Sequence, residues 1–189
     1  MRTNAAVDKK SPEYLARQVA TSRYNLLLIV IFTVVNLLFL IMEQNTYFLF
    51  SAAVPYYSTA FCMAMDLYAT GSLFGTFATI SLVVSVVILG VYLLCWIMSK
   101  KKSVWFIVAL ILFAIDTVAL VGFTLFMEMV GENVLDFVFH AWVIYSLIQA
   151  VNCSRKLKAL SDKQEAPVSP YATTPAPTPT DYYGANPEL

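Results

Sequence analysis

The chain has 189 residues, of which 59% are hydrophobic and 13% are charged, whereas soluble domains carry roughly 25% charged residues. So few charges cannot cover the surface of a soluble domain, and the apolar residues fall in long blocks that favour a lipid bilayer as their surroundings. Basic and acidic residues number 12 each, so the net charge indicates neither a nucleic-acid partner nor an acidic substrate.

The amino-terminal segment, residues 1–23, is predicted to precede the first membrane span on the cytoplasmic side. Ser11, Pro12 and Glu13 form a helix-start signal, because they supply a capping hydroxyl, a residue that needs no N–H in the first turn, and an acid near the positive helix end. A helix is therefore expected from about residue 12, either lying on the membrane or continuing into the span.

The first span is predicted at 24–42. Its 19 residues are enough to cross a hydrocarbon core, which needs roughly 17 to 25 residues in a helix. They also exceed the roughly 7 to 15 apolar residues of a signal peptide. We therefore expect an anchor that is not cleaved.

The next segment, 43–72, is expected to stay on the outer side. Tyr47 to Met65 within it is uncharged and long enough to cross, but that crossing would leave five basic residues on one side of the membrane and seven on the other. Without it, all 12 basic residues fall on one side, as the positive-inside rule requires. Pro55 and several tyrosines favour an interfacial or re-entrant helical segment here, and these two alternatives stay open.

Three further spans follow. The second is predicted at 73–98, and a short cytoplasmic loop at 99–103 joins it to the third, at 104–127. An outer loop at 128–133 leads to the fourth span, at 134–151. The predicted fold is therefore all-α, an integral membrane four-helix bundle with both chain ends in the cytoplasm, and the plasma membrane is the expected location.

The cytoplasmic tail, 152–189, differs in composition from the rest of the chain. Residues 161–189 hold six of the eight prolines and few aliphatic side chains, so we expect disorder from about residue 161. Its prolines and tyrosines suit either a docking segment for a cytoplasmic partner or a solvated tail without one.

Asp116 is the most informative single residue, because it is the thirteenth of the 24 residues in the third span and so lies near the middle of the bilayer. An ionised carboxylate there costs roughly 2.5 to 3.5 kcal/mol, so we expect Asp116 to face protein and to carry a proton. The rise of a helix places Ser85 and Tyr145 at the same depth, with His140 about one turn further out and Asp136 one turn beyond it.

These polar residues allow two interpretations. In the first, Asp116 and His140 hydrogen-bond the helices together. In the second, a broken polar line runs from Tyr145 or Asp116 through His140 to Asp136, and it moves protons or binds a cation.

Gly71 and Gly75 form a GxxxG pattern at the start of the second span. Small residues at this spacing let another backbone approach closely. The pattern therefore predicts a helix-packing face, used either inside the bundle or between subunits.

The sequence contains no catalytic signature, cofactor motif or metal-ligand pattern, which favours a non-enzymatic protein without a cofactor. The leading hypothesis is an accessory or scaffold subunit of a membrane complex, bound to another membrane protein or to a second copy of itself. The alternative is a small oligomeric transporter or channel subunit that uses Asp116 and His140 for proton or cation coupling.

Overall fold

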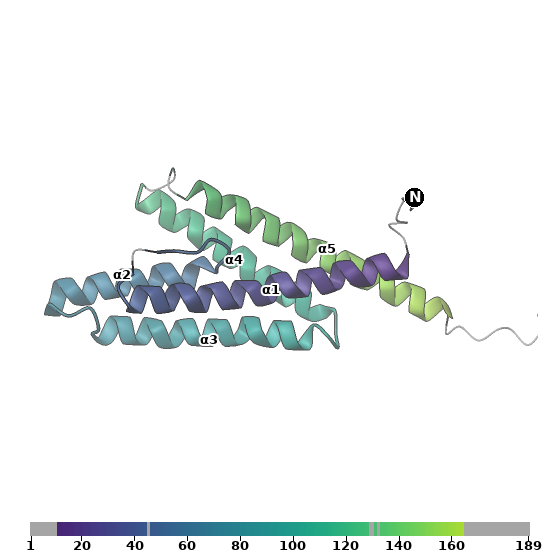
Figure 1. Ribbon diagram of the computed structural model, residues 1–189, viewed down its shortest axis with the longest axis horizontal. Helices are drawn as coiled ribbons and strands as arrows, with labels where there is room; N and C mark the ends of the chain where they lie inside the picture. Colours follow the sequence, from purple (N-terminus) through teal and green to yellow (C-terminus); the bar gives the residue numbers. More distant parts are fainter. Residues whose placement is uncertain (1–10, 45, 129–130, 132, 165–189) are drawn as a thin grey trace, which may run out of the picture.

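The computed structural model describes residues 11–44, 46–128, 131 and 133–164, and these form five α-helices without a strand (Figure 1). The helices are α1 (Pro12–Ile41), α2 (Ala53–Thr70), α3 (Thr76–Met98), α4 (Val104–Phe126) and α5 (Val134–Gln164). The prediction of an all-helical fold is therefore confirmed. Four of the helices in this part of the chain, α1, α3, α4 and α5, are long and apolar enough to cross a membrane, which is compatible with a multi-pass membrane protein.

Helix α1 begins where the helix-start signal predicts. Ser11 is the N-cap, and its side chain accepts the N–H of Tyr14 at 3.2 Å, while Pro12 occupies the first turn. The helix then continues without a break to Ile41. Of the two alternatives, the predicted amino-terminal helix therefore runs directly into the first apolar stretch.

The segment at 43–72, which is expected on the outer side, contains α2. A single helix of 18 residues, α2, runs along the long axis of the bundle (Figure 1) and packs mainly on α3, with further contacts to α1 and α4. Its first residue, Ala53, is 1% exposed. The start of α2 therefore lies inside the bundle.

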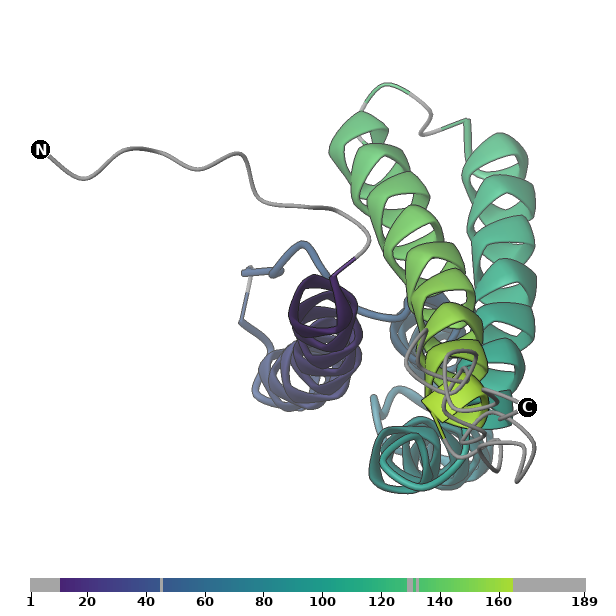
Figure 2. The ribbon, with the colours of Figure 1, turned by 90° about the vertical axis from the view of Figure 1, so that its right-hand side faces the viewer.

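Helices α3 and α4 form an antiparallel hairpin around the lysine-containing loop, and α4 and α5 lie side by side (Figure 2). Helix α5 continues past residue 151, the predicted end of the fourth span, to Gln164. Residues 161–164, expected to be disordered, are therefore helical, because the hydrocarbon thickness limits a span but not the helix that contains it. The remaining tail prediction concerns 165–189, which lie outside the described residues.

The bundle buries one apolar cluster and presents another apolar surface outward. The largest fully buried side chains include Tyr92, Phe106 and Phe113. Val87 and Val118, in contrast, are 61% and 72% exposed on α3 and α4. A soluble bundle would cover or replace such residues, whereas a bundle surrounded by lipid leaves them outside.

Candidate functional site

The residues between α1 and α2 run back along α1 toward the middle of the bundle. The side-chain amide of Asn36 donates to the carbonyl oxygen of Phe48 at 2.7 Å, and its oxygen accepts the N–H of Phe48 at 2.8 Å. Four residues later, the N–H of Ala52 donates to Thr33 Oγ1 at 2.8 Å. The chain therefore moves inward from Ile41 to the level of Thr33, which is about 12 Å along α1.

This inward segment contains a backbone conformation that is unusual for its residue type. Phe50 has a φ of +81°, a value that a bulky residue rarely adopts. Its ring packs edge-on against Phe139 and Trp142 of α5, with ring centroids 5.0 Å apart in both pairs. The aromatic contacts with α5 therefore hold the turn in place before α2 starts.

Asp116 of α4 caps the buried start of α2. Ala52 occupies the N-cap position and offers no side-chain cap. The Asp116 carboxylate takes this role from 63 residues away, accepting the N–H of Ala53 on Oδ2 and the N–H of Val54 on Oδ1, both at 2.8 Å. It is 3% exposed, and a negative group suits the positive end of a helix. The expectation that Asp116 faces protein is thus met.

His140 of α5 is the third partner of this carboxylate. Its Nδ1 lies 2.8 Å from the carbonyl oxygen of Asp136, and its Nε2 lies 3.1 Å from Asp116 Oδ2. A carbonyl only accepts, so the Nδ1 contact requires a proton on that nitrogen. A hydrogen bond between Nε2 and the carboxyl group then requires one further proton, as imidazolium with carboxylate or as imidazole with carboxylic acid, and both arrangements have zero net charge. The ring of Phe113 stacks on the imidazole at 4.8 Å.

Asp136 extends the cluster toward the end of α5 that begins at Val134. It is 3% exposed, and the phenol groups of Tyr47 and Tyr57 interact with its carboxyl group. Burial, together with the negative charge of Asp136, raises the pKa of Tyr47 well above its usual value. Tyr47 therefore stays neutral and can donate a hydrogen bond. The hydroxyl of Tyr57 donates its proton to Asn133 Oδ1 at 2.6 Å.

The structure brings together part of the predicted polar line. Asp116 is connected to His140 through their side chains, and His140 to Asp136 through the backbone carbonyl oxygen of Asp136. Tyr145 is not, because it is 58% exposed and its hydroxyl bonds with Gln149 instead. The rise of a helix gives a residue's depth, but it does not specify which side of the helix the residue occupies.

Ser85 supports the first turns of α2. It is fully buried, donates to the carbonyl oxygen of Pro55 at 3.2 Å and lies 3.1 Å from Thr59 Oγ1. Its hydroxyl therefore holds α3 against α2.

A second aspartate, which the sequence analysis missed, caps α3 in the same way. Asp66 of α2 is 2% exposed and accepts the N–H groups of Gly75 and Ala78 at 3.0 and 2.7 Å. Asp66 is a charged residue in an otherwise apolar stretch, which was the available signal. The same arrangement thus occurs twice. In each case the N-cap residue of a helix offers no side-chain cap, and a buried aspartate from a neighbouring helix accepts the free N–H groups instead.

The prediction of a GxxxG packing face is wrong. Gly71 is the C-cap of α2, with a φ of +72° that favours glycine, and Gly75 is the N-cap of α3. A Cβ atom on Gly75 would lie 2.5 Å from the carboxyl carbon of Asp66. Both glycines therefore serve the turn between two helices, where one allows a left-handed conformation and the other a close approach.

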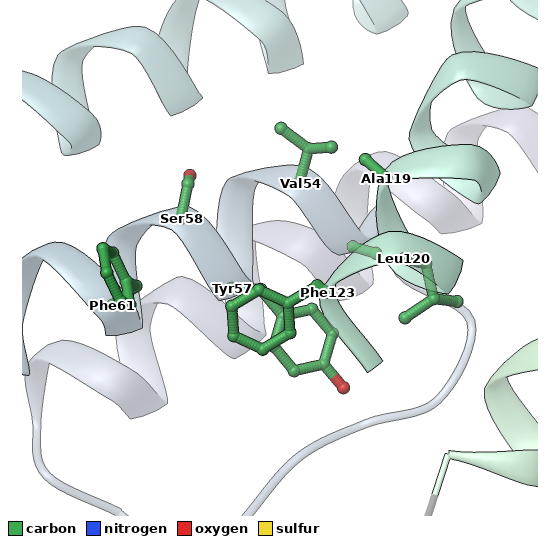
Figure 3. Close-up of a pocket in the computed structure, with 8 residues that line it drawn as sticks. Val54, Tyr57, Ser58, Phe61, Ala119, Leu120 and Phe123 are labelled. Carbon is green, nitrogen blue, oxygen red and sulfur yellow. The ribbon is translucent and has the colours of Figure 1, made fainter. Parts of the chain in front are cut away.

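An apolar pocket of about 220 Å³ opens between α2 and α4 (Figure 3). The rings of Tyr57 and Phe123 form one wall, with centroids 4.8 Å apart. The first turn of α2, which Asp116 caps, forms another part of the lining. An apolar lining of this kind suits hydrocarbon, such as a lipid chain or an apolar side chain of another protein.

One polar group in the interior lacks a partner. Among the described residues, the hydroxyl of Tyr92 on α3 is the buried side-chain polar atom without a hydrogen bond. In the same part of the chain, no three His, Cys, Asp or Glu side chains lie close enough to hold a metal ion.

Comparison with family models, with curated proteins and with solved structures finds no match to this chain.

Proposed function

We propose that this protein is an accessory or scaffold subunit of a membrane complex and has no catalytic activity of its own. The observation that supports this proposal is that both oxygens of the Asp116 carboxylate already have partners within the protein. These oxygens accept two backbone N–H groups and contact His140, all from the same chain. A buried acid whose contacts come from its own protein supports the fold and is poorly placed to bind a substrate.

In this proposal, residues 47–70 form a re-entrant hairpin that enters the bilayer as an extended chain and leaves it as α2. Extended backbone at membrane depth is tolerated only where protein satisfies its polar groups, and Asn36, Thr33 and Asp116 do so here. The segment and the loop at 128–133 would then face outward, with the lysine loop and both chain ends in the cytoplasm, as the positive-inside rule requires.

Cysteine labelling tests this orientation. A single cysteine at Glu43 should react with a membrane-impermeant thiol reagent added outside intact cells, and one at Lys101 should react only after the membrane is opened. Cys62, Cys95 and Cys153 are first replaced by alanine. Labelling of both positions from the same side would contradict the four-span topology.

The pocket between α2 and α4 is the proposed contact for a membrane-protein partner or a second copy. Phe61 at its edge is 44% exposed, so an apolar side chain from a neighbouring helix would gain contact area there. The proline-rich residues 165–189 are proposed as the contact for a cytoplasmic partner.

Site-specific photo-crosslinking in host membranes tests the contact in the pocket. A photo-reactive side chain at Phe61 should give one product of defined mass, and the same group at Val118, which is 72% exposed on α4 and not part of the pocket lining, should give lipid adducts alone. The Phe61 product should disappear when Phe123 is replaced by alanine, because Phe123 forms the pocket wall. Equal protein adducts at Phe61 and Val118, or none at either, would refute the contact.

A second candidate function is proton coupling in an oligomeric transporter or channel subunit. The specific observation that favours it is the 3.1 Å contact between His140 Nε2 and Asp116 Oδ2, which is a hydrogen bond only with a proton on one of the two groups. The carboxyl group of Asp136, with Tyr47 and Tyr57 near it, continues the polar groups on one side of this pair. A group that gains or loses this proton would change the cap of α2, which links protonation to the position of the hairpin.

A further inference from the structure

A basic pocket lies at the end of the bundle that carries the loop between α3 and α4. Its volume is about 350 Å³, and α1, this loop and the carboxyl-terminal part of α5 line it. Both α1 and α5 extend past the loop at the right-hand end of the bundle in Figure 1, and residues of both helices line the pocket. The described residues thus line an open recess that none of the Asp116 contacts uses.

The charge of this pocket is strongly positive. Lys100, Lys101, Lys102 and Lys158 line it, and Asp162 is the acid in the lining. Among the described residues, the ion pair joins His140 to Asp116. No described carboxylate therefore lies within ion-pair distance of these four lysines. An excess of unpaired cations in a concave site favours an anion.

Hydrogen-bond donors in the pocket suit an oxygen-rich anion. Serine hydroxyls contribute to the lining beside the lysines, among them Ser154 and Ser103. Ser99 also belongs to the lining, but its hydroxyl donates to the carbonyl oxygen of Trp96 at 2.7 Å and accepts from Arg23 Nε at 3.1 Å, so it does not serve as a donor to the anion. Ammonium and hydroxyl groups together match the oxygens of a phosphate.

The pocket is placed where phospholipid headgroups would lie. Its lysine loop connects the last residue of α3, Met98, to the first residue of α4, Val104, and both helices are candidate membrane spans. Trp96 lies next to the loop, with the guanidinium of Arg23 at 5.9 Å and the ammonium of Lys100 at 6.0 Å from its ring. Tryptophan and basic residues together are typical of the membrane–water interface.

We propose that this pocket binds the phosphate of an anionic phospholipid headgroup. The lipid chains would lie along the apolar faces of the neighbouring helices, and the phosphate would enter between the lysine loop and α5. Basic pockets between membrane helices are suited to such headgroups, and each lysine near the surface contributes about a fivefold gain in affinity for anionic lipid.

Quenching of tryptophan fluorescence by brominated lipid tests the proposal on the full chain in neutral detergent micelles. Trp142 is first replaced by phenylalanine, which leaves Trp96 and Trp105 on either side of the loop as reporters. Brominated phosphatidylglycerol should quench them at low mole fraction, whereas brominated phosphatidylcholine, which has the same phosphodiester without net charge, should bind much more weakly. Equal quenching by the two lipids would overturn the proposal.

Two pairs of substitutions separate a pocket from general surface charge. Lys101→Gln with Lys158→Gln removes two lining cations and should weaken phosphatidylglycerol binding by about 25-fold, from two fivefold steps. Arg155→Gln with Lys156→Gln removes two cations from α5 that do not line the pocket and should change binding by less than about threefold. Asp162→Asn should tighten binding. Equal losses from both pairs would show that only net charge matters and would refute the pocket.

Inorganic phosphate serves as a competitor in the same assay. Weak competition, requiring concentrations far above those of the lipid, is expected for a headgroup site, because the lipid chains add apolar contact. Complete displacement of the lipid by phosphate at equal concentration would instead identify a site for a soluble anion and would overturn the assignment to a phospholipid.

Discussion

Replacement of Asp116 by leucine is expected to destabilise the protein by roughly 3 to 5 kcal/mol, the range found when one member of a buried charged pair is removed. The substitution leaves the N–H groups of Ala53 and Val54 without acceptors, and it leaves His140 Nε2 without a partner. Asp116→Asn keeps the shape and one acceptor oxygen, but its NH₂ group faces a backbone donor. A smaller loss of roughly 1 to 3 kcal/mol is therefore expected for asparagine.

The reactivity of a buried cysteine measures the stability of these variants. Cys95 is fully buried, whereas Cys62 and Cys153 are partly exposed. In a Cys62→Ala, Cys153→Ala background, a thiol-reactive dye reports unfolding of the bundle in detergent as Cys95 becomes accessible. The melting temperature should decrease from the parent to asparagine and further to leucine at residue 116. The exposed Asp162→Leu is the matched control, with an expected change within about 0.5 kcal/mol. A leucine variant as stable as this control would contradict the capping role.

The same variants distinguish the two candidate functions. In a scaffold subunit, Asp116→Asn should fold and retain the crosslink at Phe61, since the cap of α2 is largely preserved. In a proton-coupled subunit, reconstituted liposomes of the parent should show a pH-driven flux that is lost in Asp116→Asn although the protein remains folded. Absence of flux in the parent would remove the second candidate and leave the first.

Asn36→Leu is the second substitution for which we expect a large effect. Asn36 makes three hydrogen bonds to the inward segment, two with the backbone of Phe48 and one with Ser51 Oγ at 2.9 Å. Leucine leaves the N–H and C=O of Phe48 without these partners. The expected loss is roughly 2 to 4 kcal/mol, because these bonds are part-buried and a backbone group that loses its partner away from water costs about 1 to 3 kcal/mol. A decrease in the melting temperature of the same Cys95 reporter measures it.

Asn25→Leu provides the matched control for this prediction. It is the same change on the same helix, but Asn25 makes a single side-chain bond, to Ser146 Oγ at 2.9 Å, so a loss of about 1 kcal/mol is expected. A second readout follows the hairpin itself: a cysteine introduced at Leu49 should react faster in Asn36→Leu than in Asn25→Leu. Equal stability and equal labelling of the two variants would show that Asn36 does not hold the segment.

Local sequence signals predicted the features that depend on short stretches of chain. The start of α1 at Pro12 follows from the hydroxyl of Ser11, a contact between residues three apart. The four apolar helices follow from run length alone, because the transfer of each side chain into lipid contributes independently of the others. The burial of Asp116 could also be predicted, since the cost of a charge in hydrocarbon requires it to face protein.

Only the tertiary structure decided which groups meet. Asp116 caps a helix 63 residues away, and Asp66 caps the start of α3 across a turn. Each contact depends on how helices rotate about their axes and pack, which a residue's depth does not specify, as the outward position of Tyr145 illustrates. The spacing of Gly71 and Gly75 predicts a packing face only if both lie on one helix, but Gly71 caps the end of α2 and Gly75 caps the start of α3. A buried polar group finds its partner among all neighbours in space, so the bundle as a whole determines the site.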